Sequence, residues 1–122
     1  MTALPSNMHL YRFADLRAKS TPYFEFVRTP DLSAGVYRLS AGAEDTQDPH
    51  TEDEIYYVVS GRARFTAGPQ STSASQSTPV SQGDLLFVPA NERHRFHDIQ
   101  EDLELLVFFA PAEWSRVAPA ST

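Results

Sequence analysis

The sequence predicts a single-domain, all-β protein, either a barrel or a sandwich. About eight short segments rich in aromatic and β-branched residues follow one another from residue 23 onward, each bounded by Pro, Gly, Ser or Asp. No convincing amphipathic helix separates these segments, which argues against the parallel α/β classes. The 122 residues are enough for one domain with one buried core.

The expected strands lie close together along the chain. They cover residues 23–28, 34–40, 55–60, 62–67, 78–81, 84–88, 94–99 and 103–110. Ser60 and Gly61 separate two of them, and because Gly supplies the positive φ that primed turns require, a tight hairpin is expected there. Asn91 is suited to a left-handed turn position. A short helical turn is expected at residues 15–19.

Three segments of different character divide the chain. Residues 1–22 are weakly patterned and are expected to pack on the barrel or on a partner, residues 23–115 form the barrel, and residues 116–122 are a flexible tail. The stretch from Gly68 to Thr78 is rich in Ser, Thr and Gln, which cannot bury apolar surface, so it is expected to be an exposed loop.

Composition excludes several classes of function. The net charge is −6 and the ten Lys and Arg residues are scattered, so a nucleic-acid partner is not expected. No apolar run reaches the length of a membrane span, and the first ten residues lack a signal-peptide pattern. The absence of cysteine excludes disulfides and thiolate ligands and fits a reducing compartment. We therefore expect a cytoplasmic protein without a membrane partner.

Two separated segments carry the residues suited to metal binding. In an extended chain the side chains of His50 and Glu54 would lie roughly 13 Å apart, so the chain must turn at residues 51–53 to bring them together. A helix would also bring them together, but the run Ile-Tyr-Tyr-Val-Val that follows Glu54 makes a helix improbable. In the second segment a strand ends at Pro89 and His94 projects from the start of the next.

These segments resemble the two motifs of the cupin superfamily, G-x5-H-x-H-x3-4-E-x6-G and G-x5-P-x-G-x2-H-x3-N. The first is matched in part by His50-x3-Glu54-x6-Gly61. The second is followed by Gly83-x5-Pro89-x-Asn91-x2-His94-x3-Asp98, in which Asn replaces Gly and Asp replaces Asn. The resemblance spans about residues 34–110 and implies a small single-domain cupin, a double-stranded β-helix or jelly-roll barrel.

The resemblance implies a divalent metal ion held by His50, Glu54 and His94. Two histidines and one carboxylate suit Fe, Mn, Ni or Zn, and ligand type alone does not choose among these ions. The chain departs from the family at the first histidine of the motif, where it has Asp48, with Gln47 before it. The fourth ligand is therefore Asp48, Gln47 or a water molecule.

Neighbouring residues have competing interpretations. Tyr56 shares strand parity with Glu54, and Phe96 with His94, so both are expected in the interior beside the metal, as substrate-binding residues or as plain core. His97 points to the opposite face and is expected to be structural or exposed. The acidic residues Glu44, Asp45, Glu52 and Asp53 are expected to form a solvated rim. Trp114 is expected to cover an open end of the barrel or to lie in a dimer contact.

The sequence favours a metal-dependent enzyme acting on a small organic molecule, of the dioxygenase, decarboxylase, isomerase or lyase type that the resemblance implies. One alternative is a binding or sensing barrel with a structural metal, and another is a barrel whose metal only stabilises the fold. The chain assigns no catalytic residue. Its expected partners are a small-molecule ligand and a second copy in a homodimer.

Overall fold

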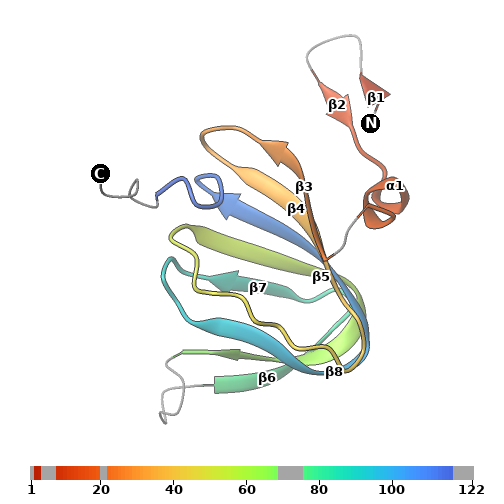
Figure 1. The fold of residues 1–122 in the computed structure, drawn as a ribbon, viewed down its shortest axis with the longest axis vertical. Helices are drawn as coiled ribbons and strands as arrows, with labels where there is room; N and C mark the ends of the chain where they lie inside the picture. Colours follow the sequence, from red (N-terminus) through yellow and green to blue (C-terminus); the bar gives the residue numbers. More distant parts are fainter. Residues whose placement is uncertain (1, 4–7, 20–21, 69–75, 117–122) are drawn as a thin grey trace.

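Two long, bent strands organise the fold. They are β5 (Asp53–Ala67) and β8 (His94–Ala110), which pair antiparallel along most of their length. Figure 1 shows both strands curving around the interior of the molecule. The structure, a computed structural model, describes residues 2–3, 8–19, 22–68 and 76–116.

Shorter strands extend the sheet on either side of this pair. The sheet order is β3 (Tyr23–Arg28), β4 (Ser33–Leu39), β8, β5 and β6 (Gln76–Ser81), while β7 (Leu85–Val88) pairs with the first half of β5. All of these pairings are antiparallel. Among the described residues only α1 (Phe13–Arg17) is α-helical. The prediction of a single-domain all-β fold is confirmed.

The predicted hairpin at Ser60–Gly61 is wrong, because the chain runs through this point as one strand. Residues 54–58 and 60–67 of β5 pair with the two halves of β8, and the register shifts between Val58 and Arg64 mark the bend. Gly61 has φ +99°, and a Cβ there would lie 2.3 Å from the backbone oxygen of Asp102. The positive φ therefore bends the strand instead of reversing it. Residues 94–99 and 103–110 are likewise joined in one strand.

The core lies on the concave face of the bent sheet. Along β5, Glu54, Tyr56 and Val58 are 1%, 0% and 0% exposed, whereas Ile55 between them is 42% exposed. This alternation is the two-residue period of a strand with one buried face. The buried cluster continues onto β8 and β4 with Leu103, Leu105, Val107, Phe109 and Leu39. The strand parity used to place Tyr56 beside Glu54 is therefore confirmed.

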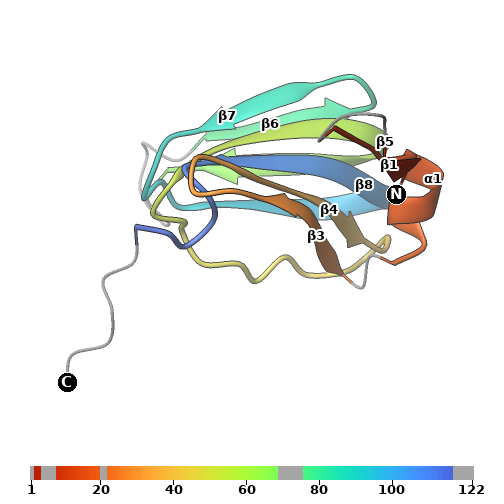
Figure 2. The same cartoon turned by 90° about the horizontal axis from the view of Figure 1, so that it is seen from above.

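The N-terminal segment contributes one buried side chain, a short helix and two short strands. Leu16 of α1 is buried, and Arg17 forms an ion pair with the buried Glu104, which also pairs with Arg38. Strands β1 (Thr2–Ala3) and β2 (His9–Leu10) form a separate two-stranded sheet. Figure 2 shows α1 at one end of the molecule. The division at residues 22 and 115 stays a prediction.

Parts of the predicted loop and tail lie outside the described residues. These are residues 69–75 and 117–122, while Gln76–Thr78, which the sequence assigned to the loop, begin β6. In the described ranges, no helix has the length and apolar character needed to cross a membrane. A cytoplasmic location stays a prediction.

Candidate metal centre

Three side chains from distant parts of the sequence converge inside the sheet. His50 lies just before β5, Glu54 is near its start, and His94 begins β8. One ligand atom from each lies within 4.8 Å of the other two, and all three side chains are buried. The two connecting loops are joined where the backbone N–H of Asn91 donates to the carbonyl of His50 at 2.7 Å. The predicted turn at residues 51–53 does bring His50 and Glu54 together.

The distances within this group show atoms converging on a shared point. Oε1 of Glu54 lies 3.1 Å from Nε2 of His94 and 3.6 Å from Nδ1 of His50. Beyond these ion-pair contacts, Nδ1 of His50 and both carboxylate oxygens of Glu54 form no hydrogen bond with the described residues. Burying such groups without a partner costs on the order of 1–3 kcal/mol each. A divalent cation bound by two imidazole nitrogens and a carboxylate would satisfy all three atoms, so the residues fit the expected ion.

Each imidazole is oriented by a partner on its far side. Nδ1 of His94 lies 2.8 Å from the carbonyl oxygen of Glu92, which can only accept, so Nε2 is the nitrogen turned to Glu54. Nε2 of His50 lies 2.9 Å from Oε2 of Glu113, which leaves Nδ1 facing the site. A metal-binding imidazole is commonly held in this way by an acceptor on its other nitrogen.

Burial and charge set the protonation of the site. Burial by itself would lower the pKa of His94, but the contacts with Glu54 and the Glu92 carbonyl favour the charged ring more strongly, and the pKa is raised. The pKa of the Tyr56 phenol is raised well above its ordinary value, mainly by burial and then by the charge of Glu54. Tyr56 therefore stays protonated and keeps a proton to donate.

Tyr56 contacts both His94 of the three-residue group and Gln47. Its hydroxyl donates to Oε1 of Gln47 at 3.0 Å and lies 3.0 Å from Nε2 of His94. The amide nitrogen of Gln47 donates in turn to Asp45 at 2.6 Å. Asp48 is exposed and no hydrogen bond of its side chain is seen in the described part of the chain. The roles of Asp48 and Gln47 as metal ligands stay predictions.

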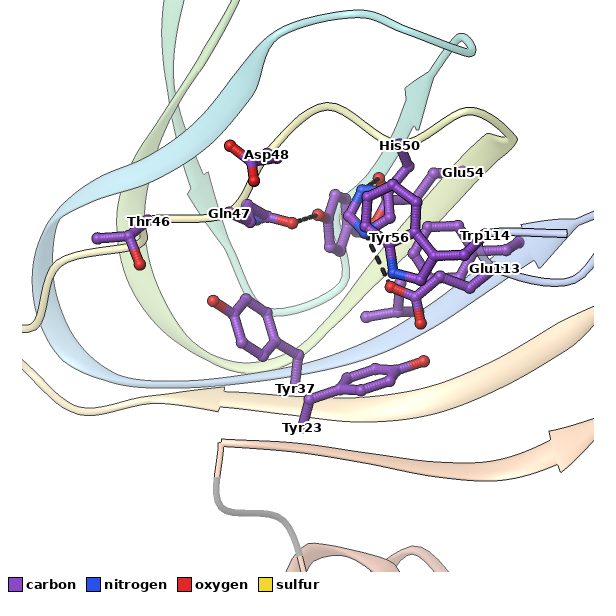
Figure 3. Close-up of a pocket in the computed structure, with 12 residues that line it drawn as sticks. Tyr23, Tyr37, Thr46, Gln47, Asp48, His50, Glu54, Tyr56, Glu113 and Trp114 are labelled. Atoms are coloured by element: carbon purple, nitrogen blue, oxygen red, sulfur yellow. Dashed lines mark hydrogen bonds and ion pairs between the residues drawn. The ribbon is translucent and has the colours of Figure 1, made fainter. Parts of the chain in front are cut away.

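A cavity of about 280 Å³ opens beside His50 and Glu54. Figure 3 shows the aromatic and carboxylate side chains that surround it. It is lined by Tyr23, Tyr37, Thr46, Gln47, Asp48, His50, Glu54, Tyr56, Val107, Phe109, Glu113 and Trp114. Phe96 is not among these residues, because it is fully buried with its ring centroid 5.0 Å from that of Tyr56. The substrate-binding roles predicted for Tyr56 and Phe96 stay predictions, and only Tyr56 reaches the cavity wall.

The sequence matches the Cupin domain family (Cupin_2) over residues 35–109. The chain belongs to the cupin family. This cupin is 44% identical over 100 residues to the protein SCO3923 of Streptomyces coelicolor, whose name describes it as uncharacterized, and the match covers 82% of this chain and 90% of that one.

Solved structures agree with this assignment. A cupin from Methanocaldococcus jannaschii, described as a double-stranded β-helix, superposes with a TM-score of 0.68 at 17% identity, covering 88% of this chain and 93% of that one. Oxalate decarboxylase from Bacillus subtilis superposes with a TM-score of 0.60 at 29% identity, covering 67% of this chain. This cupin spans only 21% of the decarboxylase chain.

Sequence reasoning missed the part that the C-terminal turn of this cupin plays in the site. Glu113 contacts His50, and the indole of Trp114 stacks on the same imidazole with ring centroids 4.5 Å apart. Trp114 has φ +63°, a left-handed conformation that is uncommon for a bulky residue. The prediction that Trp114 covers an open end of the barrel or lies in a dimer contact stays a prediction, and the sequence pattern assigned nothing to Glu113.

Two acidic residues predicted to be solvated are instead buried and hydrogen-bonded. Asp45, 6% exposed, accepts from the Tyr37 hydroxyl at 2.7 Å and from the backbone N–H of Phe96 at 2.9 Å. Glu52, 1% exposed, accepts from the backbone N–H groups of Trp114 and Arg116 at 2.6 and 2.8 Å. The prediction of a solvated rim is wrong for both, because each carboxylate fixes a neighbouring backbone segment.

The environment of Glu52 favours its charged form. Burial would raise its pKa, but hydrogen bonds from the Thr51 hydroxyl and from the backbone N–H groups of Arg116 and Trp114 outweigh burial, and the pKa is lowered. Glu52 therefore holds the C-terminal turn against the metal centre as a carboxylate.

Proposed function

We propose that this cupin is a metal-dependent enzyme that acts on a small organic molecule. The observation that carries the proposal is the buried His50–Glu54–His94 group, in which three ligand atoms have no hydrogen-bond partner among the described residues. His50 and Glu54 also line a cavity, and Trp114 stacks on His50. A purely structural ion would not need a cavity beside it. The likeness to a decarboxylase also supports an enzyme.

The protein residues define what the site does around the ion. Fe, Mn, Ni or Zn bound there would supply a Lewis acid with coordination positions open to the substrate. Glu113 and the Glu92 carbonyl hold the two imidazoles in place, and Trp114 limits access of water to His50. Tyr56 keeps its proton, donates it to Oε1 of Gln47, and so holds that side chain beside the metal centre, with its hydroxyl 3.0 Å from Nε2 of His94.

We propose Asp48 over Gln47 as a further ligand. The oxygen and the nitrogen of the Gln47 side-chain amide both have partners, since Oε1 accepts from Tyr56 and Nε2 donates to Asp45. The Asp48 carboxylate has no such partner among the described residues and lines the same cavity as His50. Asp48→Asn should weaken metal binding more than Gln47→Glu does, as measured by competition with a chelator of known affinity.

The enzyme proposal is tested by loading the protein with each candidate ion and screening small carboxylic acids, diketones and catechols for turnover. We expect product with at least one ion, and loss of turnover in the double variant His50→Ala/His94→Ala while the β-sheet circular dichroism persists. The competing function is a binding barrel with a structural metal. That function would be favoured if a compound raised the melting temperature without being converted by the protein loaded with any of the ions.

We also propose that the protein forms a homodimer. The convex face of the sheet exposes apolar side chains in two neighbouring rows, with Phe87, Ile55 and Phe108 in register across β7, β5 and β8. Phe87 is 64% exposed and Leu85 in the next row is 68% exposed. A contiguous apolar face of this kind is typical of an interface. Sedimentation should give a dimer that Phe87→Lys converts to a monomer, and a monomeric parent protein would overturn the proposal.

A further inference from the structure

The charged side chains that line the cavity are all acidic. Asp48, Glu54 and Glu113 contribute carboxylates, and no Lys or Arg is found among the described lining residues. A bound divalent ion would offset two of these three charges, which leaves the lining with a net negative charge. A second anion entering such a cavity would meet repulsion without a compensating cation, whereas a cation would complete the charge balance.

The phenol of Tyr23 adds a polar group to the cavity wall. Its hydroxyl is buried and has no hydrogen-bond partner among the described residues. Burial raises its pKa, and the charges of Glu113, Glu25 and Glu54 raise it further, more than Arg28 lowers it. A protonated phenol in a negative environment is suited to accept a hydrogen bond from a ligand N–H.

Gly35 makes room for this phenol. A Cβ at position 35 would lie 2.3 Å from the Cζ and hydroxyl oxygen of Tyr23, so the ring lies directly over the glycine backbone. With Gly35 on β4 and Tyr23 on β3, the phenol leans across the neighbouring strand. Glycine is the one residue type at position 35 that leaves room for the Tyr23 ring, so the packing of β3 on β4 fixes the position of the hydroxyl.

The carboxylate of Glu113 is held rigidly beside Tyr23. The backbone N–H of Glu113 donates to the hydroxyl of the buried Ser33 at 2.8 Å, and the backbone carbonyl of Glu113 accepts from Arg28 at 2.8 Å. One side-chain oxygen accepts from His50, and in the described part of the chain the other takes part in no hydrogen bond. Arg28 does not line the cavity, and its other contact is an ion pair with Glu25. The negative charge is thus fixed before any ligand binds.

Aromatic faces complete the wall. Tyr23 and Tyr37 lie edge to face with centroids 6.2 Å apart, and Trp114 lies on the His50 side of the same cavity. Figure 3 shows the two tyrosines across the cavity from Gln47 and Asp48. Aromatic faces attract ammonium groups, and the attraction is stronger once the cation is desolvated.

We propose that the substrate carries a protonated amine, which binds to the wall formed by Tyr23, Glu113 and Trp114 while its reacting end faces the metal ligands. This inference rests on the proposed function, because it takes the three-ligand group to be a metal site. It excludes dicarboxylic acids such as oxalate as the natural substrate class, even though a decarboxylase of oxalate shares the fold.

The test compares three small acids on the zinc-loaded protein: β-alanine, butyrate and succinate. All three offer the ion a carboxylate at one end of the same four-atom backbone, and they differ at the far end, which is an ammonium, a methyl or a second carboxylate. Trp114 is the single tryptophan of the chain, so its fluorescence reports binding at this cavity. We expect β-alanine to bind about tenfold more tightly than butyrate, as charge-assisted contacts imply, and succinate to bind most weakly.

Variants of the wall residues test whether the wall causes the preference for β-alanine over butyrate. Glu113→Gln and Tyr23→Phe should each reduce the preference for β-alanine over butyrate severalfold, whereas Asp31→Asn, at an exposed carboxylate outside the cavity, should leave it unchanged. Succinate binding as tightly as β-alanine, or no binding by any of the three in protein that holds one zinc, would overturn the inference and leave the metal site standing.

Failure of the metal site itself is recognised separately. Elemental analysis that finds no zinc, or zinc that survives His50→Ala/His94→Ala, would overturn the proposed function. In that case propylammonium and propanol, which need no metal, still test the wall in metal-free protein. If propylammonium quenches Trp114 fluorescence more than propanol does, and Glu113→Gln abolishes this difference, the result supports ammonium binding at the wall. Equal quenching by propylammonium and propanol would count against it.

Discussion

The indole ring of Trp114 lies stacked on the imidazole of His50, with ring centroids 4.5 Å apart and planes inclined by 28°. His50 is one of the three residues that converge to form the candidate metal centre, and Trp114 is the single tryptophan of the chain. The intrinsic fluorescence of this cupin therefore comes from a position in direct contact with the proposed site.

Binding of Co(II) or Ni(II) should quench this fluorescence, because an open-shell ion on His50 would lie within a few ångströms of the indole. We expect a linear decrease that ends at one equivalent of metal and recovers on addition of EDTA. Zn(II) should compete without quenching to the same depth. Fluorescence that stays constant while Co(II) binds would show that the ion lies elsewhere.

Removal of the ion should destabilise the fold. Nδ1 of His50 and both oxygens of Glu54 are buried and have no hydrogen-bond partner in the described part of the chain, so metal binding is linked directly to the folded state. At a hundredfold excess of free metal over its Kd the stabilisation is about 2.7 kcal/mol. This corresponds to a difference in melting temperature on the order of 10 °C. Calorimetry with Zn(II) and with EDTA measures it, and identical transitions would contradict the fit of the site to an ion.

Replacement of Glu52 by Gln should release the C-terminal turn. The carboxylate accepts from the backbone N–H groups of Trp114 and Arg116, and hydrogen bonds to a buried charge contribute about 1.5–3 kcal/mol. We expect lower stability to urea together with a red shift of Trp114 emission. Glu44→Gln, at an exposed acidic residue of the same loop, should change neither. Unchanged emission in the Glu52 variant would mean that the turn is held by other contacts.

Gly61 at the bend in β5 and Gly83 between β6 and β7 allow steric and conformational effects to be separated. Both have positive φ, but a Cβ at Gly61 would collide with Asp102 and Leu103, whereas a Cβ at Gly83 would meet nothing within 4 Å. Gly83→Ala should therefore cost about 1–2 kcal/mol, the penalty of a left-handed alanine. Gly61→Ala should cost clearly more. Equal losses in urea titrations would show that the close approach at Asp102 is relieved easily.

The metal centre was accessible to sequence reasoning because its three residues lie within short motifs of fixed spacing. The two-residue period of strands then placed Tyr56 beside Glu54 on the buried face, as the exposures of 0% and 1% confirm. Asn91, expected in a left-handed turn, has φ +67°. These features are local, since each depends on a few consecutive residues.

The misread features depend on contacts between distant segments. A glycine with positive φ suits both a hairpin turn and a bent strand, and only the pairing of β5 with β8 decides for the bend at Gly61. Asp45 and Glu52 have the composition of a solvated loop, but each binds backbone N–H groups more than 50 residues further along the chain. Glu113 likewise reaches His50 across 63 positions, beyond the range of any spacing pattern.

The central claim is that His50, Glu54 and His94 bind one divalent ion, and anomalous diffraction from crystals grown without chelator tests it most directly. We predict a single peak about 2.0–2.2 Å from one nitrogen of each imidazole and from a carboxylate oxygen of Glu54. A metal-loaded crystal whose anomalous peak lies away from these three side chains would contradict it.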